Sequence, residues 1–81
     1  QTQRAASTTA PNILSFKERR EFETLEQRIA ELEAQRDSIE RRLQAATEDY
    51  VTLAALGEEH GRVLESIDVA TMRWLELGER A

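Results

Sequence analysis

The chain has 81 residues, of which 40% are apolar and 33% are charged, so it forms one small domain at most. Its 16 acidic and 11 basic residues give a net charge of -5, and it contains no cysteine. These values exclude a two-domain enzyme, a disulfide framework and a zinc site built on thiolates. Aromatic residues make up only 5% of the chain, and its richness in Glu, Arg, Ala and Leu is typical of a long helix or a coiled coil.

The N-terminal residues 1–13 are predicted to form a flexible, disordered linker. They consist mainly of Gln, Thr, Ser and Ala with the single proline, Pro11, and contain no apolar repeat. The folded part, residues 14–81, begins with Ser15 and Glu18, which have the Ser-x-x-Glu spacing of a capping box. This motif places the start of a helix at Ser15.

A first helix is predicted over about residues 15–46. Its apolar residues recur in alternating steps of three and four, which keeps them on one face of a helix. Arg36 is the one polar interruption of this stripe, which consists of Phe22, Leu25, Ile29, Leu32, Arg36, Ile39, Leu43 and Ala46.

A second helix is predicted over about residues 49–79, with the same spacing and with His60 as its polar member. Its stripe consists of Leu53, Leu56, His60, Val63, Ile67, Ala70, Trp74 and Leu77. The first register, continued past residue 46, would instead place Tyr50 and Gly57 on the stripe. The change of phase indicates a turn, after which Thr47 or Asp49 caps the new helix.

These elements predict an all-α fold, a monomeric two-helix antiparallel coiled-coil hairpin whose helices are each about 45 Å long. In the register that pairs every layer, Trp74 lies opposite Leu25. The flanking charges in that register place Arg42 beside Glu59, Glu21 beside Arg80, and Arg28 beside Arg73 in a like-charge conflict.

No residue pattern indicates catalysis, a cofactor or a metal, so we expect no such site in this chain. His60 has no second His or Cys to share a zinc ion with, and we interpret it as a seam side chain that reaches the solvent. Trp74 is interpreted as a core residue and not as a stacking platform for a ligand. The glycines are isolated and form no phosphate-binding loop.

Lys17, Arg19 and Arg20, with help from Arg4 in the linker, are the strongest indication of nucleic-acid binding. They are grouped near the start of the first helix, but acidic residues surround them. We therefore expect weak contacts to phosphates without base reading. No apolar run approaches the roughly 20 residues of a membrane span, and no signal peptide is evident, so we expect no membrane partner and a cytoplasmic location.

Two spaced motifs carry a family resemblance. The sequence LSFKERREFETL at residues 14–25, followed by Ile29 and Leu32, resembles the opening of the C-terminal domain of ABC-F ATPases of the Uup type, where the pattern is close to Leu-Ser-Tyr/Phe-Lys-Glu-Gln/Arg-Arg-Glu-Leu-Glu. The sequence RWLEL at residues 73–77 resembles the Arg-Trp-x-x-Leu motif that closes the same domain.

The resemblance implies a domain that follows the second nucleotide-binding domain of a soluble, non-transporting ABC protein. ATP and Mg²⁺ would then bind to those preceding domains, which are the implied partners within the parent chain. Members of the family act on ribosomes, and the Uup-type coiled coil is associated with DNA binding. The resemblance therefore favours an accessory domain that contributes weak, sequence-independent binding of DNA or ribosomal RNA. The alternative is a purely structural coiled-coil arm that docks protein.

Overall fold

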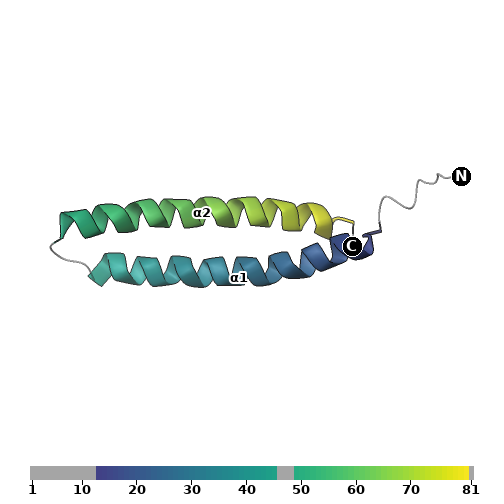
Figure 1. The fold of residues 1–81 in the computed structure, drawn as a ribbon, viewed down its shortest axis with the longest axis horizontal. Coiled ribbons are helices and arrows are strands. Elements are labelled where there is room, and N and C mark those ends of the chain that lie inside the picture. The colour runs from purple at the N-terminus through teal and green to yellow at the C-terminus, as the bar shows by residue number, and fades with distance from the viewer. Residues whose placement is uncertain (1–12, 46–48, 81) are drawn as a thin grey trace, which may run out of the picture.

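The computed structural model describes residues 13–45 and 49–80, which form two antiparallel helices (Figure 1). Helix α1 spans Phe16–Ala45 and helix α2 spans Tyr50–Gly78. The start of α1 and the end of α2 lie together at one end of the hairpin, which we call the open end. The all-α hairpin prediction is confirmed. The predicted linker falls outside the described residues except for Ile13, as do Ala46 and Thr47.

A reciprocal capping box starts α1, as its sequence predicts. The Glu18 N–H donates to Ser15 Oγ at 3.1 Å, and the Ser15 N–H donates to a Glu18 carboxylate oxygen at 3.1 Å. Both bonds satisfy backbone donors that a helix N-terminus would otherwise leave unpaired. Leu14, directly before the cap, is buried.

Asp49 caps α2. Its Oδ1 accepts hydrogen bonds from the N–H groups of Val51 and Thr52 at 3.0 and 3.3 Å, and its Oδ2 accepts one from the Thr52 hydroxyl at 2.6 Å. The Thr52 hydroxyl is the main cause of the lowered pKa of Asp49. A carboxylate at this position also faces the positive end of the helix dipole. Asp49, one of the two predicted caps, therefore ends the turn.

The two predicted stripes face each other and form the core. The residues that are at least nine-tenths buried along the seam are Leu32, Ile39, Leu56, Val63, Ala70 and Leu77. On α2 they recur every seven residues, the period that keeps a stripe on one side of a coiled-coil helix. The polar members of the stripes, Arg36 and His60, are half-buried, and each binds a carboxylate, that of Asp37 or of Glu40.

The predicted charge pairs across the seam need correction. The register places Glu21 beside Arg80. In the structure the Glu21 carboxylate accepts hydrogen bonds from Arg73 at 2.8 and 3.0 Å. The expected conflict between Arg73 and Arg28 is also resolved, since the Arg28 guanidinium turns to Glu31 at 3.8 Å.

The predicted position of Arg42 beside Glu59 does not lead to an ion pair. Within residues 13–45 and 49–80 these two side chains form no ion pair. Long charged side chains on an exposed flank gain little from such a contact, so their register position alone does not fix a partner.

Trp74 packs in the seam near the open end. Its ring stacks on Phe22 with centroids 5.5 Å apart and an interplanar angle of 8°; the predicted register assigns Phe22 to the neighbouring layer. Phe22 in turn lies 3.5 Å from the position that a Cβ on Gly78 would occupy. The Trp74 Nε1 is buried and has no hydrogen-bond partner in the described part of the chain. The indole therefore contributes by packing.

We expect Trp74→Ala to destabilise the hairpin by about 3 kcal/mol or more, because the seam has no third layer that could fill the space. Leu75→Ala, at the adjacent and half-exposed position, is the matched control and should cost far less. Chemical denaturation followed by circular dichroism measures both. Equal effects of the two substitutions would show that Trp74 is not part of the core.

Candidate functional site

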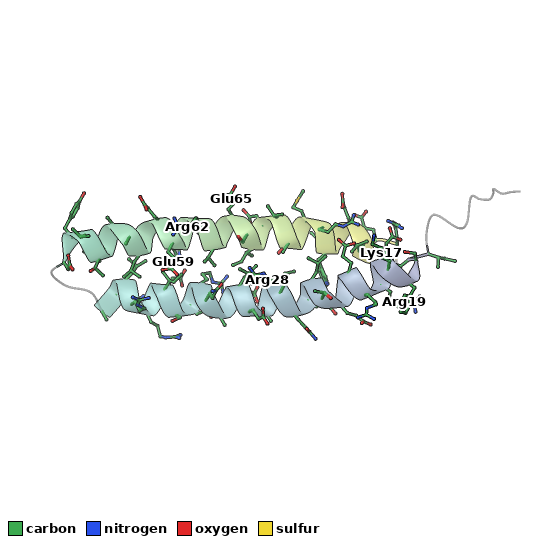
Figure 2. All side chains as sticks on the ribbon, in the orientation of Figure 1. Lys17, Arg19, Arg28, Glu59, Arg62 and Glu65 are labelled. Carbon is green, nitrogen blue, oxygen red and sulfur yellow. The ribbon has the colours of Figure 1, made fainter. Side chains whose placement is uncertain are left out.

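The predicted basic residues lie together at the open end, on the first two turns of α1. Lys17, Arg19 and Arg20 are all exposed (Figure 2 labels Lys17 and Arg19). The Arg20 guanidinium carbon lies 5.8 Å from the centroid of the Phe16 ring, a cation–π contact that holds it on the outer side of the helix. Arg4 falls outside the described residues.

Arg73 of α2 and Arg80, which follows the end of α2, bind acidic residues next to this basic cluster. Arg73 donates to Glu21 of α1 and, at 3.0 Å, to Glu76 of its own helix. The Arg80 guanidinium donates to a Glu18 carboxylate oxygen at 2.6 Å. The same Glu18 oxygen accepts the N–H of Ser15, so one carboxylate both caps α1 and binds the end of α2.

These contacts stabilise the charged forms of both carboxylates. The hydrogen bond from Arg80, followed by that from the Ser15 backbone, lowers the pKa of Glu18. The hydrogen bonds from Arg73 lower the pKa of Glu21, and the pKa of Arg73 is raised in return. The contacts with Arg80 and Arg73 therefore favour the ionised forms of Glu18 and Glu21.

As a consequence, Lys17, Arg19 and Arg20 take part in no ion pair within residues 13–45 and 49–80. Their charges are available to an anionic partner. The exposed carboxylates of Glu23 and Glu79 belong to the same end of the hairpin and limit the positive potential there. The arrangement suits weak phosphate contacts, which depend on such unpaired cations.

The sequence analysis missed the two α2–α1 ion pairs at the open end. A signal for them was present, because Arg73 and Arg80 are one heptad apart, so that a helix continued to residue 80 would carry both on one side. Their Glu partners are separated by three residues on α1, which also places these on one side. What the spacing does not give is which carboxylate each arginine reaches.

His60 is a seam residue that binds one carboxylate. Its Nε2 lies 3.0 Å from Glu40 and its side chain is 24% exposed, in agreement with the interpretation as a seam residue that reaches the solvent. In the described part of the chain, no three His, Asp or Glu side chains are placed to share a metal ion. Among the same residues, neither helix is long and apolar enough to cross a membrane.

Two open grooves follow the seam, one along each side. The larger, of about 610 Å³, has an apolar floor that includes Leu32, Val69 and Ala70. Three guanidiniums line it, those of Arg28, Arg62 and Arg73, together with the carboxylate of Glu65; we call it the cationic groove.

The smaller groove, of about 340 Å³, is lined by Glu26, Ile29, Glu33, Thr71 and Trp74, and we call it the acidic groove. The two grooves draw on different residues of the same helices. The two grooves therefore differ in the charge of the residues that line them.

Comparison with known proteins gives a family match over almost the whole described region. Residues 13–79 match the family described as the ABC transporter C-terminal domain. The chain is also 33% identical over 64 residues to the uncharacterized ABC transporter ATP-binding protein YfmR of Bacillus subtilis (strain 168). The matched segment makes up 79% of this chain and 10% of that relative. The chain thus spans about a tenth of the length of this relative. No solved structure matches the chain significantly.

The lowered pKa values of Glu18, Glu21 and Asp49 predict a loss of stability in acid. A carboxylate with a lowered folded pKa stabilises the fold above its ordinary pKa, which is 4.5 for Glu and 3.8 for Asp, and this contribution is lost as the pH falls through the folded value. We expect the thermal midpoint to fall as the pH drops below about 4.5.

The double variant Glu18→Gln, Glu21→Gln should have a lower midpoint at neutral pH and a shallower fall in acid. Glu58→Gln, Glu59→Gln removes two α2 carboxylates that form no ion pair in the described region and should keep the wild-type profile. Parallel profiles for all three proteins would contradict a role for the open-end ion pairs.

Proposed function

Since the chain belongs to the ABC transporter C-terminal domain family, we propose that it is an accessory domain of an ABC-F ATPase that adds weak, sequence-independent contacts to DNA or ribosomal RNA. The contacts run through Lys17, Arg19 and Arg20, with Arg4 as a further cation. This domain contributes no chemistry of its own. ATP and Mg²⁺ bind to the nucleotide-binding domains of the parent protein, and the whole acts in the cytoplasm.

The observation that carries the proposal is the absence of ion-pair partners for these three cations within the described residues. The chain as a whole is acidic. The carboxylates of Glu21 and Glu18, which lie next to these cations on α1, are nevertheless bound by Arg73 and Arg80. An isolated group of exposed, unpaired cations on the first turns of a helix matches the geometry of phosphate contact.

The expected mode of binding is electrostatic. Three phosphate contacts would give a slope of about -3 in a plot of log affinity against log salt for duplex DNA. Base recognition requires side chains presented by an element that fits a groove, and nothing in the described part of the basic cluster arranges its Arg side chains in that way. Shape and the parent protein would therefore supply selectivity.

We expect the 81-residue chain to bind duplex DNA, branched DNA or ribosomal RNA at low salt and to lose the complex at moderate salt. The double variant Arg19→Glu, Arg20→Glu should abolish the complex, because it replaces two attractive charges by repulsive ones. Fluorescence anisotropy over a salt series measures both the affinity and its slope.

The matched control is Arg41→Glu, Arg42→Glu, an adjacent pair of exposed arginines near the other end of α1. It changes the net charge of the chain by the same amount and should leave most of the affinity intact. Equal losses in the two variants would show that only the total charge matters. No binding by the wild type at low salt would favour a purely structural arm that docks protein.

A further inference from the structure

The cationic groove combines a positive rim with an apolar floor, in a chain whose net charge is -5. Three arginines and one glutamate line it; because Arg73 is paired with Glu21 and Glu76, the two arginines that remain, Arg28 and Arg62, outnumber Glu65. The Val69 side chain on its floor is 65% exposed. A surface of this kind is matched by a partner that is apolar along one line and acidic on either side of it.

Two of the rim arginines are available for such a partner. Arg62 of α2 forms no ion pair within residues 13–45 and 49–80. Arg28 of α1 meets Glu31 only at 3.8 Å, with both side chains more than half exposed, and such a surface contact stabilises little. Figure 2 shows these two arginines on opposite helices. Arg73 is engaged by Glu21 and Glu76.

We propose that the cationic groove is a docking site for an acidic amphipathic helix of another protein, which packs along the seam as a third helix. Its apolar side chains would cover Leu25 and Val69. Its flanking carboxylates would bind Arg28 on one side and Arg62 on the other. Helix-in-groove recognition of this kind uses apolar anchors spaced by three and four residues.

The dimensions of the groove set the length of this partner. Its lining runs from Leu25 to Leu32 on α1 and from Arg62 to Arg73 on α2, about 10 and 16 Å along the helix axes at 1.5 Å per residue. A helix of two to three turns therefore spans it. Residues 1–12 of this chain contain no Asp or Glu and do not have the required charge.

The apolar floor favours a protein partner over a phosphate backbone. Phosphate contacts need exposed cations and gain nothing from burying leucine and valine side chains. An acidic helix uses both properties, because its apolar face removes the floor from water while its carboxylates meet the rim. The docking site is therefore independent of the proposed nucleic-acid contacts at the open end.

The test titrates the 81-residue chain with a designed 16-residue helical peptide that carries Leu at three–four spacing and Glu on both flanks. A second peptide has Lys in place of every Glu. We expect the Glu peptide to bind and the Lys peptide to fail. Chemical shift changes in labelled protein should centre on residues that line the cationic groove.

The double variant Arg28→Glu, Arg62→Glu should lower the affinity for the Glu peptide by about tenfold or more. Val69→Asp should also lower this affinity. Arg41→Glu, Arg42→Glu and Arg19→Glu, Arg20→Glu should each leave its affinity within about twofold. Circular dichroism confirms that every variant is folded. Retained binding by Arg28→Glu, Arg62→Glu, or equal binding of both peptides, would overturn the proposal.

Two further outcomes would assign the groove to another occupant and equally overturn the proposal. One is a wild-type dimer, detected by sedimentation without peptide, that Arg28→Glu, Arg62→Glu dissociates. The other is a loss of nucleic-acid binding in this variant comparable to that in Arg19→Glu, Arg20→Glu. Failure of nucleic-acid binding alone leaves the peptide result unaffected, so the two proposals fail separately.

Discussion

The single seam between α1 and α2 is the constraint on which the rest of the described structure depends. Two helices can bury side chains only along the line where they touch, so the core consists of small layers such as Leu56, Val63 and Ala70 on one side of α2. Neither flank of this line is covered, and both remain as grooves. The helix starts are closed by polar contacts, Ser15 with Glu18 at the start of α1 and Asp49 with Val51 at the start of α2.

The fold could be predicted from the sequence because its determinants are local and periodic. A capping box, an Asp cap and two heptad stripes each act within a few residues, and the structure confirms all of them. The charge pairs across the seam could not be predicted in the same way. Register places the Cα atoms, whereas a guanidinium reaches several ångströms along the axis, and Arg73 uses this reach to bind Glu21.

The candidate sites differ in how far the sequence reveals them. The sequence predicts the group of Lys17, Arg19 and Arg20 because these residues are neighbours in it. Their lack of ion-pair partners depends on the binding of Glu18 and Glu21 by Arg80 and Arg73. Only the folded structure shows these contacts. The cationic groove is a stronger case, since Arg28 and Arg62 belong to different helices and meet only when the chain folds back. The net charge of -5 is a sum over the whole chain and does not reveal that arginines predominate among the charged residues of the cationic groove.

The contacts of the Glu18 carboxylate affect how the hairpin can move as a unit. One of its oxygens accepts hydrogen bonds from the Ser15 N–H and from the Arg80 guanidinium. It thereby connects the start of α1 to the residues that follow α2 at the open end. The connected end lies about 45 Å away, the length of a 30-residue helix. A tilt of about 10° at the base would carry that tip through roughly 8 Å, as a lever does. Small rotations of the open end would thus become large displacements at the far end.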